Sequence, residues 1–218
     1  MTKKEAETIT GGLSQTSKMP CQSYSLPPAL CPVGSRLARV QGSACEGCYA
    51  TKGAYNWGST QRAMARRQSS LTHPEWVQGM IRLVSAQKSG LFRWHDAGDI
   101  QSLEHLRKIV AVCEGTPQVR HWLPTREYRT IALYQREVGL FPENLTVRVS
   151  VHMVDSYQLP KIPGVVFSTI HRHTTPPESA HVCPAYRQGG KCHGASEGGT
   201  DCGACWSKTC AHVSYRYH

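Results

Sequence analysis

Residues 91–126 read LFRWHDAGDIQSLEHLRKIVAVCEGTPQVRHWLPTR, and this stretch decides the fold class. It opens with a short strand at residues 91–95, which runs into a polar turn. Apolar residues then recur at helical spacing over residues 103–113, behind Ser102 as a fair N-cap. A second strand follows at residues 119–123. A strand, a helix and a strand joined by short links predict a βα unit of a parallel sheet.

The same alternation continues outward on both sides of this unit. The further elements that we expect are helices at 59–70, from Pro74 onward and at 131–138, and strands at 145–151 and 165–170. Residues 1–30 carry Gly, Ser and Pro at positions that break any period, so we expect them to be irregular. The predicted fold class is α/β, with a partial or small βα-barrel-like parallel sheet and a cysteine-rich C-terminal metal-binding module.

Two cysteine groups of matching form flank the predicted sheet. Each group closes with a C-x-x-C pair, a spacing that lets two thiolates turn toward one metal or cluster. The groups are Cys21, Cys31, Cys45 and Cys48 near one end, and Cys183, Cys192, Cys202 and Cys205 near the other. We therefore expect two separate metal sites. The first belongs to a barrel-like domain at residues 1–174, and the second to a Cys/His-rich metal-binding module at residues 175–218.

The start of the chain is charged and polar, which predicts neither a signal peptide nor a membrane span. Without export, cysteines stay reduced in the cytoplasm, so metal ligands are favoured over a disulfide framework. Both iron–sulfur and zinc sites fit the pattern. Cys21 could close the first site as a fourth ligand. In the second site, His193 (beside Cys192) or His212 (near Cys210) could replace a cysteine.

The formal net charge of +10 suits a polyanionic partner, most simply DNA or RNA. The basic residues are scattered, with one Arg-rich stretch from Arg62 to Arg67. Aromatic side chains that could stack on bases, or equally complete a core, are Trp57, Trp94, Trp122, Tyr128 and Trp206. The hydrophobic content of 39% predicts a modest core, to whose stability bound metal would add.

Polar side chains follow three successive predicted strands. Asp96 and Asp99 follow the first strand, Arg126 follows the second and His152 follows the third. Because function gathers where parallel strands end, we expect these four residues to be catalytic and to face the N-terminal metal site. The alternative for Asp99 is that it caps the helix after it.

The motif Cys45-x-x-Cys48-Tyr49-Ala50, preceded by Cys31-Pro32, resembles two phage families. One is the Gp37/Gp68 group of phage radical-SAM-like proteins, and the other is a shorter gene-product-88-like family. The strand ends at residues 95–99, 122–126 and 147–151 also look like those of these proteins. The tail from Cys183-Pro184 to Trp206 is similar to that of the shorter family.

The resemblance implies a partial βα barrel in which Cys31, Cys45 and Cys48 hold a [4Fe–4S] cluster, with a second cluster as an option. It also implies that the fourth iron position is free for S-adenosylmethionine, and that a reductant is needed. The turn Asp96-Ala97-Gly98-Asp99, together with Tyr49, would contact this cofactor. The sequence departs from the usual C-x-x-x-C-x-x-C spacing, because thirteen residues separate Cys31 from Cys45.

Three functions follow from these observations. The first is a phage iron–sulfur enzyme of radical-SAM type, in the host cytoplasm, which modifies nucleic acid or a nucleotide-derived substrate. The second is a zinc- or cluster-stabilised transglycosylase or glycosylase acting on DNA, with Asp96 and Asp99 as nucleophile and acid/base. The third is a non-catalytic nucleic-acid-binding metalloprotein.

Overall fold

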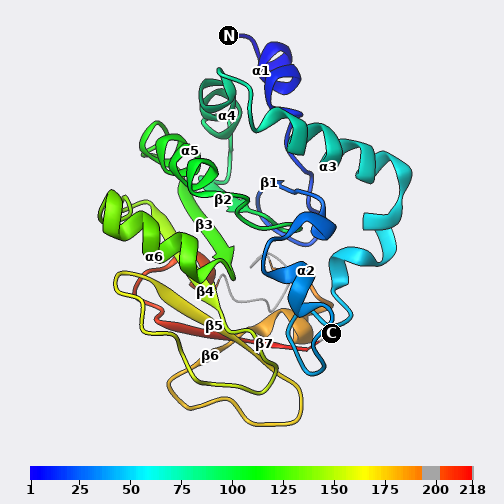
Figure 1. Cartoon of the computed structure of the whole chain (residues 1–218), viewed down its shortest axis with the longest axis vertical. Helices are drawn as coiled ribbons and strands as arrows, with labels where there is room; N and C mark the ends of the chain where they lie inside the picture. The colour runs from blue at the N-terminus through cyan, green and yellow to red at the C-terminus, as the bar shows by residue number, and fades with distance from the viewer. Residues whose placement is uncertain (193–201, 218) are drawn as a thin grey trace.

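The computed structural model describes residues 1–192 and 202–217, and its centre is an open, all-parallel sheet of seven strands (Figure 1). The strand order is β1-β2-β3-β4-β5-β7-β6. The strands are β1 Ser23–Tyr24, β2 Leu91–Trp94, β3 Arg120–Thr125, β4 Leu145–Ser150, β5 Val166–His171, β6 His181–Val182 and β7 His212–Arg216. The prediction of an α/β fold with a parallel sheet is confirmed, and the sheet does not close into a barrel.

A single helix joins β2 to β3 and another joins β3 to β4, as the sequence predicts, whereas the described residues between β4 and β5 contain no helix. The helices are α1 Lys3–Thr10, α2 Gly34–Leu37, α3 Gly58–Ser70, α4 Trp76–Val84, α5 Leu103–Glu114 and α6 Tyr128–Glu137. Short 3-10 turns are η1 Pro28–Leu30, η2 Tyr49–Thr51, η3 Gly53–Asn56, η4 Pro184–Gln188 and η5 Ala204–Trp206. None of the helices in the described part of the chain is long and apolar enough to cross a membrane.

The main core lies between the sheet and the row of helices α4, α5 and α6, which pack side by side (Figure 1). Alternate residues of the central strands point toward these helices because side chains in a strand switch face at each position. Phe92 and Trp94 of β2 and Leu123 of β3 are fully buried there. The Ser102 hydroxyl accepts a hydrogen bond from the His105 amide at 3.1 Å, so the predicted cap of α5 is present.

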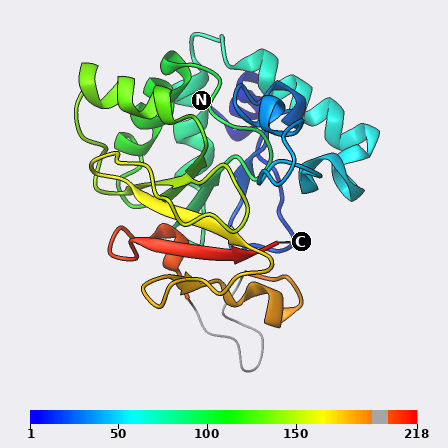
Figure 2. The same cartoon turned by 60° about the horizontal axis from the view of Figure 1, so that its bottom comes forward.

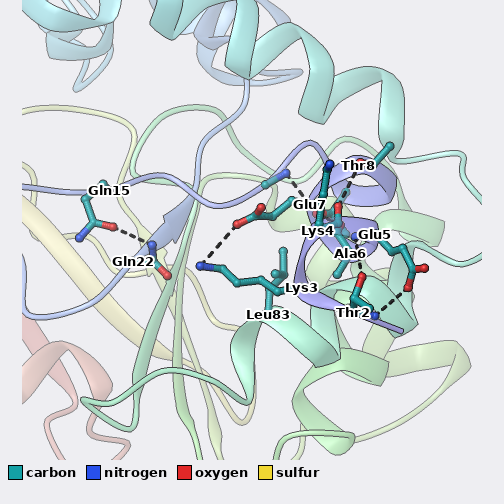
Figure 3. A network of polar contacts seen from close by, with 12 residues as sticks. Thr2, Lys3, Lys4, Glu5, Ala6, Glu7, Thr8, Gln15, Gln22 and Leu83 are labelled. Carbon is teal, nitrogen blue, oxygen red and sulfur yellow. Dashed lines mark hydrogen bonds and ion pairs between the residues drawn. The ribbon is translucent and has the colours of Figure 1, made fainter.

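The expectation that residues 1–30 are irregular is wrong at α1 and β1. The Thr2 hydroxyl accepts from the Glu5 amide, and the Glu5 carboxylate accepts from the Thr2 amide, which is a capping box (Figure 3). The helix packs closely on α4. A Cβ atom on Gly79 would lie 2.7 Å from the Thr10 side chain, so this approach needs glycine. β1 has only two residues, too few to show a period in the sequence.

The C-terminal segment continues the same sheet. β7 lies between β5 and β6, so the expected domain boundary at residue 174 falls between strands of one sheet. The 3-10 turn η5 lies against β3 and β4, on the side of the sheet away from the helices (Figure 2). Trp206 of η5 packs edge-on against Trp122 and donates its Nε1–H to the Phe92 carbonyl at 2.9 Å. This segment therefore covers the second face of the sheet.

Candidate functional site

Three cysteines of the N-terminal group converge on the loop that follows β1. A Cβ atom on Gly34 would lie 3.6 Å from the Sγ atoms of both Cys31 and Cys45, so the two sulfurs flank the same backbone. Burial raises the pKa of the Cys31 thiol, and the charges of Asp99, Cys48 and Cys45 raise it further. Cys48 also raises the pKa of Cys45. The structure thus brings together the three residues that the resemblance names as ligands.

Cys21 does not join this group. It packs instead with Trp122, Cys205 and Trp206 on the second face of the sheet, next to Cys192. Burial raises its pKa to about 12. Cys21 precedes β1 and Cys31 follows it, so the two cysteines lie toward opposite ends of this strand. The interpretation that Cys21 closes the first site as a fourth ligand therefore gains no support from the fold.

Asp96 is held by hydroxyl groups at the end of β2. Its Oδ1 accepts hydrogen bonds from Ser23 and from Ser25, the latter at 2.5 Å. Its Oδ2 accepts from the Tyr55 hydroxyl at 2.9 Å, and the Tyr49 hydroxyl donates to its backbone carbonyl. Both carboxylate oxygens therefore accept hydrogen bonds. Asp96 thereby holds the segment at residues 25–57, called the cysteine loop below, against the sheet.

Asp99 joins the ends of β2 and β3. Its Oδ1 accepts from the Ile100 amide at 2.8 Å and from the Thr125 hydroxyl at 2.6 Å, and its Oδ2 accepts from the Arg126 amide at 2.9 Å. Ser102 caps α5, so the alternative that Asp99 caps this helix is wrong. Burial raises the pKa of Asp99, while these hydrogen bonds oppose the rise. Its charge acts on Cys31 and Cys45, which places the carboxylate beside the thiols.

Arg126 and His152 complete the rim of predicted strand-end residues. The Arg126 guanidinium opposes the rise in the pKa of Cys45, so the cation lies near the thiols. Its buried Nε has no hydrogen-bond partner among the described residues. His152 stacks on Tyr128 at 4.2 Å between ring centroids, and its Nε2 lies 3.3 Å from the Arg126 carbonyl. Burial lowers the pKa of His152.

Two further charged residues near this site were not predicted from the sequence. Glu127 is buried, and its Oε1 accepts from the Val33 amide at 2.8 Å inside the cysteine loop. Burial raises the pKa of Glu127 to about 7. Arg93 lies on the second face of β2, with its guanidinium over the Trp122 ring at 4.5 Å and 3.4 Å from the Tyr49 hydroxyl. Their positions in the sequence could have indicated both residues. Glu127 directly follows Arg126 at a strand end, and Arg93 lies within a strand among apolar residues.

The C-terminal cysteines meet at a second place. Cys183, Cys192, Cys202 and Cys205 line one small cavity together with His181. Cys210 and His212 do not line it, and His212 instead pairs with the Thr169 hydroxyl at 2.8 Å. His193 lies outside the described residues. Within those residues, no three His, Cys, Asp or Glu side chains stand in a geometry ready to hold a metal ion. Binding at either cysteine group therefore involves rotation of thiol side chains.

The Arg-rich stretch of α3 is divided between surface and core. Arg62 and Arg66 are exposed, whereas Arg67 is buried and donates to the Gly12 carbonyl at 2.8 Å. Of the tryptophans considered for base stacking, Trp57 is 66% exposed and lies just before α3, while Trp94, Trp122 and Trp206 are buried. A nucleic-acid surface built on α3 would thus use two arginines and one tryptophan.

Comparison with known proteins gives one match. The model of the family described as gene product 88 matches residues 1–208. No curated protein and no solved structure matches. The match confirms the gene-product-88-like part of the resemblance and is consistent with a bacteriophage origin, but it gives no support to the Gp37/Gp68 part.

Proposed function

The chain belongs to the gene product 88 family, and we propose that it is an iron–sulfur enzyme of radical-SAM type. In this proposal Cys31, Cys45 and Cys48 bind one [4Fe–4S] cluster. The observation that carries it is the convergence of three thiols, while the fourth cysteine of the sequence group lies elsewhere. Three cysteine ligands on a four-iron cluster leave one iron position for another molecule.

The chemistry of the surrounding residues fits such a cluster. Cysteine binds metal as the thiolate, and burial together with repulsion from neighbouring negative charges disfavours free thiolates at Cys31 and Cys45. A cationic metal group removes that repulsion. The Arg126 guanidinium offsets the negative charge of an iron-bound set of thiolates. The position also fits, because ligands of open parallel sheets bind outside the carboxyl ends of the strands.

A cluster with an open iron position supplies the electron for reductive cleavage of S-adenosylmethionine, and a separate reductant must provide that electron. The residues of this chain position the cofactor. The turn after β2 depends on Gly98, which has φ +87° and where a Cβ atom would lie 2.6 Å from the Leu26 side chain. Asp96 and Tyr49 hold that turn against the cysteine loop. Arg126 and His152 face the same edge and are the groups proposed to orient the substrate.

The proposed substrate is nucleic acid or a molecule derived from a nucleotide. The support is the net charge of +10 and the position of α3, which begins directly after the cysteine loop and exposes Arg62 and Arg66. Exposed arginines bind phosphates, and Trp57 offers a ring on which a base can stack.

The transglycosylase alternative finds less support in the site. A carboxylate nucleophile needs a free oxygen aimed at the substrate, yet both oxygens of Asp96 and of Asp99 accept hydrogen bonds from the protein. The non-catalytic alternative keeps both metal sites and the basic surface, and it differs only in having no cofactor reaction.

The test is a cofactor assay on protein purified and reconstituted with iron and sulfide without oxygen. With a strong reductant, we expect the protein to cleave S-adenosylmethionine to 5′-deoxyadenosine and methionine. A brown protein that binds nucleic acid without any cleavage would favour the non-catalytic alternative. A colourless protein that retains only zinc after reconstitution would refute the proposed function.

A further inference from the structure

A cavity of about 30 Å³ lies between β6, η4 and η5, on the face of the sheet away from the helices. The sulfur-bearing residues that line it come from three separate stretches of chain. Cys183 directly precedes η4, Cys192 follows η4, Cys202 precedes η5 and Cys205 lies within η5. After rotation of their side chains, four thiols from separate segments could bind one metal ion and tie those segments together.

The four thiols are also close in electrostatic terms. Beyond the effect of burial, the charge of Cys202 raises the pKa of Cys183. Burial raises the pKa of Cys205 to about 12, and the charges of Cys192 and Cys183 raise it as well. Each of the four is therefore linked to at least one other.

Polar groups lie within hydrogen-bond distance of three of these sulfurs. The Tyr215 hydroxyl lies 3.1 Å from the Cys205 Sγ, and the His181 Nε2 lies 3.2 Å from the Cys202 Sγ. The Ala185 amide donates to Cys183. Donors to ligating sulfurs orient the ligands and stabilise the thiolate form in metal sites. Neither His181 nor Tyr215 was predicted to contact the cysteines, and the two residues lie on neighbouring strands β6 and β7.

We propose that this cavity binds a single tetrahedral divalent ion through Cys183, Cys192, Cys202 and Cys205, and that the ion is zinc. A second iron–sulfur cluster is the other outcome that the test below distinguishes. Four cysteine ligands satisfy zinc completely and leave no position for substrate, so the site is structural.

The ion has a defined structural role in this fold. It fastens η5, whose Trp206 covers the second face of the sheet and contacts β2 and β3. Buried Arg148 of β4 donates to the carbonyls of Ala204, Ser207 and Cys210, so the sheet holds the same segment from its other side. The proposal is independent of the chemistry at the N-terminal cysteines, because the two groups share no residue.

The experiment measures zinc and iron by elemental analysis in four full-length proteins expressed with both metals: wild type, Cys31→Ser/Cys45→Ser, Cys202→Ser and Cys21→Ala. We expect one zinc per chain in the wild type, in the Cys31→Ser/Cys45→Ser variant and in Cys21→Ala. Cys21 is the matched control because it packs beside Cys192 and Cys205 but does not line the cavity. Cys202→Ser is expected to lose most of its zinc and to unfold at lower temperature.

Either of two results would overturn the proposal: cluster iron that persists in the Cys31→Ser/Cys45→Ser variant, or full zinc occupancy in Cys202→Ser. If Cys202→Ser does not fold, the wild type is stripped of metal with a chelator and reloaded with Co²⁺. The visible spectrum is then expected to be that of tetrahedral cobalt bound by four sulfurs. A spectrum of octahedral cobalt would refute the site without reference to any enzyme activity.

Discussion

The two cysteine groups share a closing C-x-x-C pair but occupy different surroundings. The N-terminal trio lies on a loop at the carboxyl end of the sheet, beside Asp99, Glu127 and Arg126. The C-terminal four line a small cavity against a packed face, with the Tyr215 hydroxyl and the His181 ring within hydrogen-bond distance of two of their sulfurs. In the functions proposed above, the same C-x-x-C spacing serves two different roles. The number of thiols and the charges around them suit the N-terminal trio to chemistry and the C-terminal four to structure.

The largest effect should come from removing one thiol of the N-terminal trio. Cys45→Ser is expected to lose its iron and to reduce cleavage of S-adenosylmethionine to the background level, because two thiolates do not hold the cluster. Zinc content and the unfolding temperature should stay near those of the wild type. An equal loss of zinc would show that the two groups do not act as separate sites. Iron content and product formation are measured on the same preparation.

The segment that carries the C-terminal group should depend strongly on Arg148. This side chain is fully buried and donates to four backbone carbonyls, one in β5 and three in the segment after η5 begins. We expect Arg148→Met to lower the free energy of unfolding by roughly 3–5 kcal/mol, since the carbonyls lose their donors. The exposed Arg120→Met is the control and should change stability by less than about 0.5 kcal/mol. Chemical denaturation measures both, and equal effects would contradict the assigned role.

The free energy of unfolding should fall at acid pH, because two histidines are buried in the core beside the sheet that carries both sites. Burial lowers the pKa of His95 to about 4 and that of His121 to about 3, below the ordinary value of 6.5. The unfolded chain therefore binds more protons than the folded chain between these values. Stability should be complete above about pH 6.5 and fall as the pH drops toward 4. His95 alone contributes on the order of 3 kcal/mol to this loss. Denaturation midpoints that stay constant from pH 7 to pH 4.5 would contradict it.

The smallest effect concerns the surface next to the N-terminal trio. Arg62→Ala and Arg66→Ala should each weaken binding to single-stranded or duplex nucleic acid a few-fold and lower the slope of log affinity against log salt by about 1. Arg136→Ala is the control, because this exposed arginine lies on α6, on the other side of the molecule (Figure 1). Filter binding over a salt series measures the slopes. Equal losses in all three variants would mean that α3 is not the contact surface.

The parallel sheet could be predicted because its units have clear periods, as residues 91–126 show. Other parts carried weaker signals. The capping box of α1 resembles an irregular polar run in the sequence. The strand β7, with His212, Val213, Ser214 and Tyr215, was not predicted because the cysteines before it indicate metal binding instead. The packing of Cys21 away from the other three cysteines could not be predicted, because proximity in sequence does not reveal that β1 stands between Cys21 and Cys31.

The sequence predicted which residues lie at the candidate site, but it did not predict the contacts that those residues make. Asp96 and Asp99 do lie at the strand ends, yet their oxygens are engaged in holding the cysteine loop and β3. Asp96→Asn and Asp99→Asn would therefore disturb folding as well as any activity. Glu127 was missed because burial of a carboxylate depends on which loop covers it, and its partner Val33 lies 94 residues away. Such contacts follow from topology and not from local pattern.

The central claim, an open N-terminal site beside a closed C-terminal one, is tested most directly by electron paramagnetic resonance. The sample is the reduced, reconstituted protein, measured with and without S-adenosylmethionine. The account predicts the signal of one reduced [4Fe–4S] cluster per chain, which changes shape when the cofactor is added because the cofactor binds the free iron position. A cluster signal that is unchanged by the cofactor, or no cluster signal at all, would contradict it.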